Sequence, residues 1–386
     1  MAYKTVSQIA IDGKRLLLRL DLNVPVKEGR VTDMTRIDAV LPIIKYAMEH
    51  KAKVILCSHL GRPDGKRVPE DSLKPVAEVL SRILRVPVPL APDCVGKDVK
   101  AMVAKMRDGD VIMLENLRFH EEEEANDPEF SKELASLADV YVNDAFAAAH
   151  RAHASLHGVP MLMKQHGKPV AAGFLMDEEL KLWDPIVKGS GKSVAIVGGA
   201  KLKEKMEAVD KFSKKFDRVI LGGVVANVFM MAQGIDIGDS RYLEKDKDYT
   251  QKAKEILEKD AAHKIALPKK VILATPKFER KGEAEAKSIE KGLIFADILP
   301  TEEDLQTIRD AQRIVWFGPM GAYEFGFRDG SRAVVDAIAR SHGICVIGGG
   351  DLAEAARGVK AKISTGGGAS IQYITTGKLE ALEALE

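Results

Sequence analysis

The chain has 386 residues, which is enough for two large domains with sizeable hydrophobic cores. Hydrophobic residues make up 46% and charged residues 30%, a composition that excludes disordered, collagen-like and coiled-coil proteins. The 58 Lys and Arg residues nearly cancel the 57 Asp and Glu residues, leaving a formal net charge of +1. No overall field therefore attracts nucleic acid or an anionic membrane, and any anion-binding surface must be local.

The three cysteines, Cys57, Cys94 and Cys345, lie far apart and form no CxxC spacing. This distribution favours a reducing compartment and argues against a disulfide framework or a structural zinc site. No apolar run approaches the roughly 20 residues of a membrane span, and the N-terminal residues lack the apolar core of a secretory signal. We therefore expect a soluble, cytoplasmic protein.

Short runs rich in Val, Ile and Leu alternate with longer amphipathic stretches along the whole chain. The runs predict strands at 16–20, 54–57, 111–114, 140–142, 194–197, 219–221, 271–274, 314–317 and 344–347. Amphipathic stretches between them predict helices that include 36–49, 73–84, 204–212 and 332–340. Continuous apolar runs are typical of parallel strands buried on both faces, so the alternation predicts a doubly wound α/β fold.

The residues that directly follow the predicted strands differ between the two halves of the chain. In the first half they carry polar side chains: Asp21, Asn23, His59, Arg62, Glu115, Arg118, Asn143 and Asp144. In the second half they are glycine turns, at 198–199, 222–223, 318–321, 348–350 and 366–368, which use many of the 32 glycines. Ligands of such sheets bind beyond the carboxyl ends of the strands, so these residues are the candidate site.

The two sets of residues favour two anionic ligands. Glycine turns before helices let phosphate oxygens approach backbone N–H groups, which favours a polyphosphate. Arg and His side chains favour a small, highly charged anion, and Arg36 and Arg151 extend that set. Surface ion pairing could explain any one of these arginines, but four at comparable positions favour anion binding. A polyphosphate and a second anion together indicate an enzyme of phosphoryl transfer.

Eight segments carry a resemblance to a known family. They are LLRLDLNVP (17–25), SHLGRPDG (58–65), LENLRFHEEE (114–123), NDAFAAAHRAHAS (143–155), VGGAKLKEK (197–205), WFGPMGAYE (316–324), GGGDLAEA (348–355) and STGGGAS (364–370). Together and in this order they resemble phosphoglycerate kinase. The resemblance implies reversible transfer of a phosphoryl group between 1,3-bisphosphoglycerate and ADP in glycolysis, giving 3-phosphoglycerate and ATP.

The resemblance also implies a domain arrangement. Two Rossmann-like domains are expected, with residues 1–172 binding 3-phosphoglycerate and residues 173–374 binding the Mg²⁺-nucleotide. A hinge helix is expected near 173–183, and residues 375–386 are expected to pack back on the first domain. Members of the family are usually monomeric.

The resemblance assigns roles residue by residue. Glycerate and its phosphate would be bound by Asp21, Asn23, Arg36, His59, Arg62, Arg118 and Arg151. Catalytic roles would fall to Arg36, Lys201, Lys205, Gly350 and Gly367. The nucleotide would be bound by Gly199, Lys201, Gly222, Gly223, Pro319, Glu324, Gly349, Gly350, Asp351 and Leu352. Asp351 would also hold Mg²⁺.

In such a reaction the protein mainly has to align the two substrates and neutralise negative charge. The acceptor is a carboxylate that is already ionised near neutral pH, so no general base is required. Catalysis then consists of holding the reactants in line and neutralising the transferring phosphoryl group. Two substrates on separate domains imply closure of the domains, which excludes water.

Three residues depart from the pattern of the family. Phe317 stands where Asn is usual, Leu352 stands where Thr is usual, and Phe295 replaces a small residue. We expect these bulky apolar side chains to surround the nucleotide pocket and to affect nucleotide affinity and base selectivity. Two alternatives remain on these grounds: a kinase of another small carboxylate, and an inactive nucleotide-binding regulator of the same fold.

Two further patterns have ordinary structural interpretations. The run 121–124 of four Glu residues is interpreted as a solvated helix start. His150, His153 and His157 are interpreted as packing or surface residues, because no carboxylate or thiol lies at ligand spacing among them.

Overall fold

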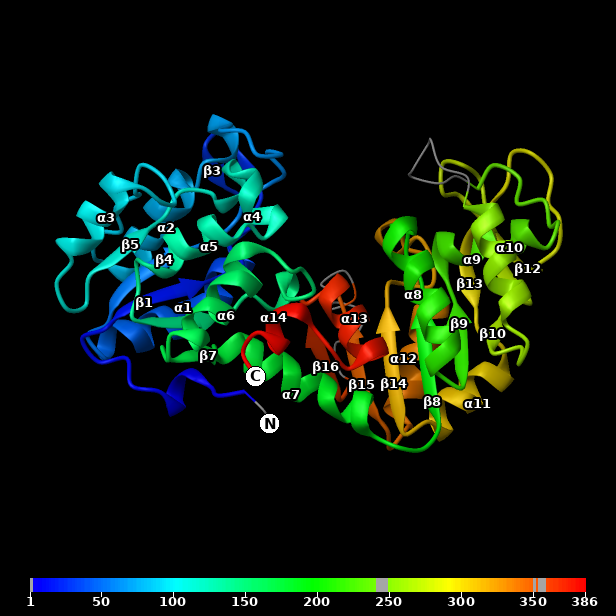
Figure 1. Cartoon of the computed structure of the whole chain (residues 1–386). Coiled ribbons are helices and arrows are strands. Elements are labelled where there is room, and N and C mark those ends of the chain that lie inside the picture. Colours follow the sequence, from blue (N-terminus) through cyan, green and yellow to red (C-terminus); the bar gives the residue numbers. More distant parts are fainter. Residues whose placement is uncertain (1–2, 241–248, 350–351, 353–358) are drawn as a thin grey trace. The chain divides into compact units, whose positions relative to one another are not determined.

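The computed structural model describes residues 3–240, 249–349, 352 and 359–386. The chain forms two compact units, each described separately below (Figure 1). Unit 1 comprises residues 1–181 and 378–386, and unit 2 comprises residues 182–377. None of the helices in the described ranges is both long and apolar enough to span a membrane.

Unit 1 is built on a five-stranded parallel sheet with the order β5-β4-β1-β6-β7. Its strands are β1 (Arg15–Arg19), β4 (Lys53–Cys57), β5 (Val111–Met113), β6 (Val140–Asn143) and β7 (Val170–Ala172). Counted along the chain, the order is 3-2-1-4-5, which is that of a doubly wound sheet. The four strands predicted in the first half are confirmed, because their apolar runs are buried in the sheet.

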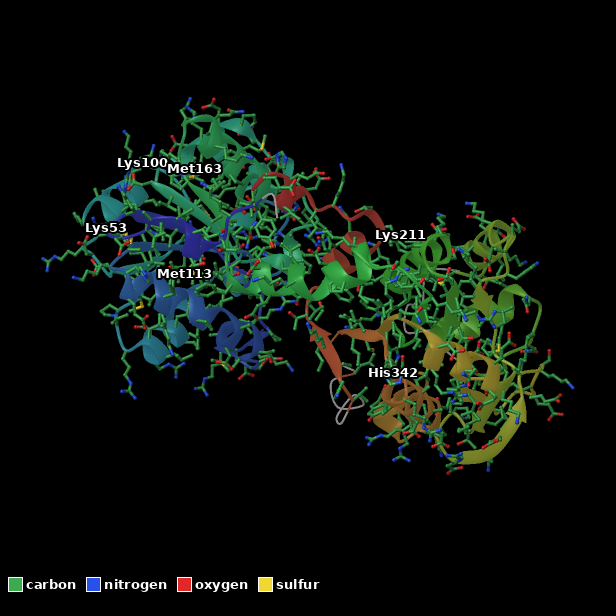
Figure 2. The ribbon with its side chains drawn as sticks, turned by 90° about the horizontal axis from the view of Figure 1, so that it is seen from below. Lys53, Lys100, Met113, Met163, Lys211 and His342 are labelled. Carbon is green, nitrogen blue, oxygen red and sulfur yellow. The ribbon has the colours of Figure 1, made fainter. Side chains whose placement is uncertain are left out.

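Helices of unit 1 pack on this sheet (Figure 1). They are α1 (Thr35–Glu49), α2 (Lys74–Leu84), α3 (Lys97–Ala104), α4 (Glu121–Ala125), α5 (Pro128–Ala135), α6 (Val159–Gln165) and α14 (Glu380–Glu383), with a two-stranded ribbon of β2 (Val26–Lys27) and β3 (Arg30–Val31). Met113 and Met163 lie buried in this unit, whereas Lys100 points from its surface (Figure 2). The backbone N–H of Ala381 in α14 donates to the carbonyl of Ala149 at 3.0 Å.

Unit 2 contains a six-stranded parallel sheet with the order β10-β9-β8-β14-β15-β16. Its strands are β8 (Ser193–Val197), β9 (Arg218–Leu221), β10 (Ile265–Ala266), β14 (Arg313–Phe317), β15 (Ile344–Gly348) and β16 (Ala361–Ser364). Its helices are α8 (Leu202–Lys215), α9 (Gly223–Ala232), α10 (Thr250–Lys259), α11 (Glu302–Asp310), α12 (Asp329–Ala339) and α13 (Gly368–Thr376). The order along the chain is 3-2-1-4-5-6, the arrangement of a Rossmann fold.

The predicted strand at 271–274 does not belong to the parallel sheet. It is β11 (Lys270–Ala274), the centre of an antiparallel sheet with β12 (Arg280–Glu285) and β13 (Ile294–Leu299). The prediction of a parallel strand was wrong here, because a short apolar run shows that a strand is buried and does not show the direction of its neighbours. Exposed residues on β12 show that this small sheet has a solvated edge.

The boundary between the units falls inside helix α7 (Phe174–Lys188), between Lys181 and Leu182. The helix follows Gly173, where an added Cβ would lie 2.4 Å from the carboxylate of Asp144, so only glycine fits at this approach. Asp144 in turn accepts a hydrogen bond from the backbone N–H of Met176 at 2.9 Å. The end of β6 therefore fixes the start of the helix that continues into unit 2.

Candidate active site

In unit 1 the loops after β1 and β4 are joined by hydrogen bonds at the carboxyl edge of the sheet. The side chain of Asn23, after β1, accepts a hydrogen bond from the backbone N–H of Gly61, after β4, at 2.9 Å. The backbone N–H of Leu22 donates to Ser58 Oγ at 2.9 Å. β1 lies next to β6, which is the point where the strand order reverses. Doubly wound sheets bind their ligands at this switch point.

Arg36 is held at this edge by Asp21. Its Nη1 lies 2.7 Å from Oδ1 and 2.8 Å from Oδ2 of Asp21, whose own side chain is mostly buried. The Arg36 side chain keeps 42% of its surface exposed. Because these contacts engage only Nη1 and the side chain is well exposed, the guanidinium has further donors with which to bind an anion.

His59 is buried beside Arg19, a residue that lies inside strand β1. Arg19 Nη2 is 3.2 Å from Nδ1 of His59. A guanidinium only donates hydrogen bonds, so Nδ1 accepts and the ring proton of neutral His59 is on Nε2. Burial, followed by the charges of Arg19, Arg118, Arg151 and Arg36, holds the pKa of His59 well below its usual value. His59 is therefore a neutral donor surrounded by cations.

A buried network fixes Arg19 in turn. Its Nε donates to Ser155 Oγ at 2.9 Å, and Ser155 donates from its backbone N–H and its hydroxyl to Glu123 at 2.8 and 2.6 Å. Tyr141 donates its hydroxyl to the carbonyl of Ser155 at 2.7 Å. Glu123 is fully buried, so the interpretation of 121–124 as a solvated helix start was wrong for this residue. Only one carboxylate of the run turns inward, and it faces the buried cation.

The remaining predicted residues of unit 1 differ in exposure. Arg118 is buried, donates from Nη1 to the carbonyl of Gly61 at 2.9 Å, and has its Nε 2.9 Å from a carboxylate oxygen of Glu124. Burial, followed by the charge of Arg151, lowers the pKa of Arg118. Arg151 is half-buried, and Arg62 is exposed. The structure thus brings Arg36, Arg118 and Arg151 close enough to His59 for their charges to lower the pKa of its ring.

In unit 2 the switch point lies between β8 and β14. The turn after β8 and the turn after β14 are in direct contact, because the N–H of Gly199 donates to the carbonyl of Pro319 at 2.8 Å. An added Cβ on Gly198 would lie 2.1 Å from the Pro319 oxygen, and one on Gly318 would lie 2.3 Å from the Gly198 oxygen. These two glycines are required because two backbones meet.

The predicted nucleotide-binding glycines fall into two groups. Gly222 and Gly223 are packed, since an added Cβ would lie 2.6 Å from Met320 Sδ or from the Gly199 nitrogen, respectively. Gly349 and Gly367 have positive φ angles of 101° and 53°, and no described atom lies within 4 Å of their ideal Cβ positions. The second group leaves open space beside exposed backbone, as a phosphate-binding turn requires.

Two lysines begin helix α8 at the same edge. Lys201 is its exposed N-cap residue, and Lys205 lies one turn further on with its Nζ 5.2 Å from the ring centroid of Phe317. The Phe317 ring is buried and stacks on Trp183, with centroids 6.0 Å apart and planes 5° apart. Phe317 is thus a buried core residue that contacts a cation. The sequence instead predicted that its side chain lines the nucleotide pocket.

Other predicted residues of unit 2 complete this description. Leu352 and Phe295 are also buried, Pro319 is half-buried and Glu324 is exposed. Gly350 and Asp351, predicted to bind phosphate and Mg²⁺, lie outside the described residues.

The architecture and the two kinds of strand edge define a class of protein, a two-domain α/β kinase of a small anionic substrate. The family model of phosphoglycerate kinase matches residues 6–378. The phosphoglycerate kinase of Chloroherpeton thalassium is 44% identical over 402 residues, covering 100% of this chain and 99% of the relative. That of Clostridium botulinum strain Alaska E43 is 42% identical over 403 residues, covering 99% and 98%.

Solved structures give the same result. The phosphoglycerate kinase of Coxiella burnetii superposes with a TM-score of 0.80 at 33% identity, covering 99% of this chain and 98% of that one. The Pyrococcus horikoshii enzyme has a TM-score of 0.79 at 32% identity, with the same coverage. The chain belongs to the phosphoglycerate kinase family. It is a phosphotransferase of glycolysis, and these comparisons do not favour the inactive regulator or the kinase of another carboxylate.

Proposed function

We propose that unit 1 binds 3-phosphoglycerate or 1,3-bisphosphoglycerate and that unit 2 binds the adenine nucleotide. The observation that carries this assignment is the group of Arg36, Arg118 and Arg151 whose charges act on His59, which lies just after the carboxyl end of β4. Three guanidinium groups match the carboxylate and phosphate of such a ligand. Neutral His59 adds a hydrogen-bond donor that does not depend on protonation near neutral pH.

Within unit 1, individual roles follow from the contacts. Arg36 is well exposed and is held by Asp21, and it is assigned to the reacting end of the substrate, where charge develops during transfer. Arg118, Arg151 and exposed Arg62 are assigned to the distal phosphate and carboxyl oxygens. Asp21 and Asn23 are assigned to orienting Arg36 and the Gly61 turn, and to substrate hydroxyl groups.

Within unit 2, the open turns at Gly349 and Gly367 are assigned to the phosphates, with Gly350. Lys201 and Lys205 are assigned to the transferring phosphoryl group, and Gly199, Gly222, Gly223, Pro319, Glu324 and Leu352 to the adenosine. Phosphoglycerate kinases use ATP with Mg²⁺, and Asp351 is the residue proposed to hold the ion here. Bound Mg²⁺ would neutralise phosphate charge.

The reaction needs alignment more than proton transfer. The acceptor carboxylate is already ionised, so Arg36 and the two lysines act by neutralising the equatorial oxygens in the transition state. Because the substrates are assigned to different units, transfer requires closure that brings them into line and excludes water.

A coupled assay with 3-phosphoglycerate, ATP and Mg²⁺ tests the proposal, with glycerate as the matched control substrate. We expect turnover with 3-phosphoglycerate that is strongly reduced with glycerate, because glycerate lacks the phosphate that the arginines bind. Equal turnover of the two substrates would contradict the assignment of the arginines, and an absence of turnover would contradict the activity.

A further inference from the structure

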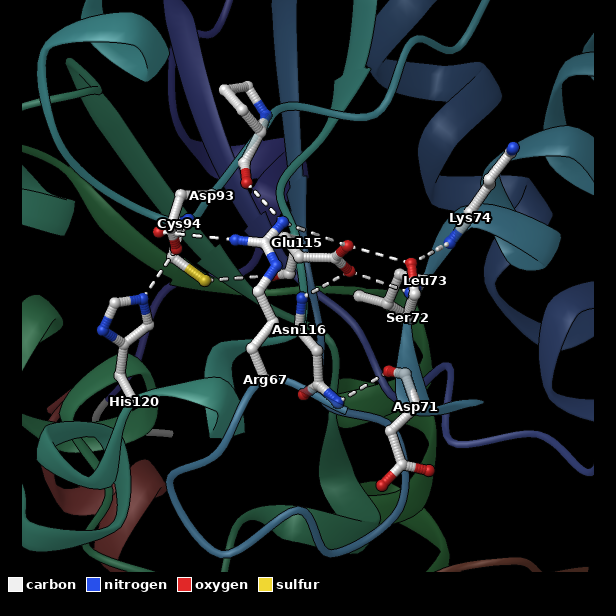
Figure 3. A network of polar contacts seen from close by, with 11 residues as sticks. Arg67, Asp71, Ser72, Leu73, Lys74, Asp93, Cys94, Glu115, Asn116 and His120 are labelled. Carbon is white, nitrogen blue, oxygen red and sulfur yellow. Dashed lines mark hydrogen bonds and ion pairs between the residues drawn. The ribbon is translucent and has the colours of Figure 1, made fainter. Parts of the chain in front are cut away.

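A cluster of metal-ligating side chains lies in unit 1, formed by residues that the proposed reaction does not use. Asp93 and Cys94 precede helix α3, and His120 follows the short helical turn η3 (Leu117–Phe119). One carboxylate oxygen, one Sγ and one ring nitrogen of these residues all lie within 4.8 Å of one another. The close-up shows the three side chains converging from two separate loops (Figure 3).

The contacts within the cluster put the three ligand atoms around one point. His120 Nε2 lies 2.6 Å from Asp93 Oδ1, and the backbone N–H of Cys94 donates to the same oxygen at 2.7 Å. The Cys94 thiol donates to the carbonyl of Glu115 at 3.1 Å. Cys94 is fully buried, whereas the side chains of His120 and Asp93 keep 26% and 37% of their surface exposed. The imidazole and carboxylate are thus reached from solvent, and an ion that replaces the hydrogen bond between them would also meet the buried thiol.

Neighbouring charges orient the ligand groups from outside. Arg67 Nη1 lies 3.8 Å from Asp93 Oδ2, the oxygen that does not face His120. Glu122 Oε2 lies 4.0 Å from His120 Nδ1, the nitrogen on the far side of the ring. His120 Nε2–H donates to Asp93 Oδ1, and the Glu122 carboxylate on the other side of the ring supports a proton on Nδ1 when Nε2 binds a metal instead. Both ligands thus have an outer partner of the appropriate charge.

We propose that Asp93, Cys94 and His120 form a binding site for a divalent cation of the zinc class, with water as a fourth ligand. Thiolate and imidazole ligands select Zn²⁺ and its neighbours among the transition metals, whereas Mg²⁺ prefers oxygen ligands alone. Binding displaces the thiol proton to solvent, and the imidazole proton moves to Nδ1. The site does not depend on the proposed substrate-binding residues.

The wide spacing of the cysteines excludes a structural zinc site in which several cysteines bind the same ion. It does not exclude a site with one cysteine. This cluster uses one cysteine with two ligands supplied by the fold, and His120 lies 26 positions after Cys94. A thiol binds a metal ion only after losing its proton, so a cation must displace that proton and binding should tighten as pH rises.

Titration of the full-length protein with Co²⁺ in excess Mg²⁺ tests the site. We expect one equivalent of Co²⁺ to give a thiolate-to-metal charge-transfer absorption, and Zn²⁺ to abolish it by displacement. Cys94→Ser should lose the absorption, whereas Cys345→Ser, which removes another buried thiol, should keep it. An absence of the absorption in the wild type, or its persistence in Cys94→Ser, would overturn the proposal.

A second variant covers the case in which Cys94→Ser fails to fold. His120→Gln changes a partly exposed side chain and should weaken Co²⁺ binding by about 100-fold or more, since even outer partners contribute roughly 10- to 100-fold. Exposed His166→Gln is its control and should bind Co²⁺ as the wild type does. Unchanged affinity in a folded His120→Gln variant would equally overturn the proposal.

Discussion

The guanidinium of Arg19 lies 3.2 Å from Nδ1 of His59, and this contact fixes the chemistry of the histidine. Because Arg19 only donates, the free donor of His59 is Nε2–H and the ring is neutral. Burial and the charges of four arginines keep the pKa of His59 well below its usual value. We infer that His59 recognises the substrate as a hydrogen-bond donor and not as a cation.

His59→Gln should therefore retain more function than His59→Phe. A glutamine amide can place an N–H near the position of Nε2, whereas phenylalanine leaves a charged ligand without that hydrogen bond. Loss of a hydrogen bond to a charged group corresponds to about 1.5–3 kcal/mol, or roughly 10- to 100-fold in kcat/KM for 3-phosphoglycerate. Steady-state kinetics of the two variants checks this, and equal losses would show that Nε2–H is not the recognising group.

Arg36→Ala should lower kcat more than it raises KM for 3-phosphoglycerate. The guanidinium is oriented by Asp21 toward the proposed reacting end, and charge develops there only during transfer. A loss of about 10²- to 10³-fold in kcat is expected, by analogy with removal of one transition-state donor. Exposed Arg82 on helix α2 supplies the control variant, Arg82→Ala, which should behave as the wild type. The reverse pattern, with a raised KM and an unchanged kcat, would limit Arg36 to ground-state binding.

Phe317→Leu should weaken catalysis through Lys205 without changing the preference for the base. The ring lies 5.2 Å from Lys205 Nζ, and such a contact is worth about 0.5–1 kcal/mol, which is roughly two- to fivefold in kcat/KM for nucleotide. ATP and GTP should be affected by the same factor, because the ring is buried against Trp183.

Phe295→Leu is the matched control for this prediction. Phe295 is another buried phenylalanine of unit 2, on β13. Its replacement should lower the stability of unit 2 without the kinetic effect. A change in the ratio of kcat/KM for ATP to kcat/KM for GTP in Phe317→Leu would contradict this prediction and support a contact between Phe317 and the base.

The stability of the Asp144→Asn variant relative to the wild type should be higher at neutral pH than at acidic pH. Burial raises the pKa of Asp144 from 3.8 to about 7, and no described atom donates to its Oδ2. Between these two values the folded protein binds a proton that the unfolded chain has lost, so the contribution of Asp144 to stability falls as pH rises from about 4 to 7. Over this whole pH interval the change in the free energy of unfolding is roughly 4 kcal/mol.

Urea unfolding followed by circular dichroism at several pH values between 4 and 8 measures this effect. The stability of Asp144→Asn relative to the wild type should increase with pH through that window and then level off. Glu129→Gln, at a largely exposed carboxylate, should show no comparable trend. A difference between Asp144→Asn and the wild type that is constant across pH would refute the buried ionisation. Asp144 lies in unit 1, whereas both tryptophans, Trp183 and Trp316, lie in unit 2. Tryptophan fluorescence therefore follows the unfolding of unit 2 separately.

The sequence predicted four strands of each parallel sheet, because strands buried on both faces form continuous apolar runs. It did not predict the short edge strands β7, β10 and β16. It also indicated which loops carry polar side chains and which carry glycines, since ligands of such folds bind after the strands. The direction of β11 was not predictable, because its own short apolar run does not show that β12 and β13 pair with it in antiparallel fashion.

The supporting network could not be predicted for a different reason. Arg19 lies in an apolar strand, and its partner Ser155 is 136 positions away. Glu123 belongs to a run that is typical of a solvated surface, and its burial and its contact with Ser155 appear only in the folded structure. Glycines 198 and 318 were interpreted as part of a phosphate cradle, whereas the contact between their turns also requires them. Each of these roles depends on pairs of residues that only the fold brings together.

Peptide-resolved hydrogen–deuterium exchange with each substrate alone tests the central assignment most directly. We expect 3-phosphoglycerate to slow exchange in the loops of unit 1 that contain residues 21–23, 59–62 and 118. ADP with Mg²⁺ should slow exchange in the turns of unit 2 that contain residues 198–205, 318–324 and 366–370. Protection of the unit 2 turns by 3-phosphoglycerate, with unit 1 unchanged, would contradict the division of the two substrates between the units.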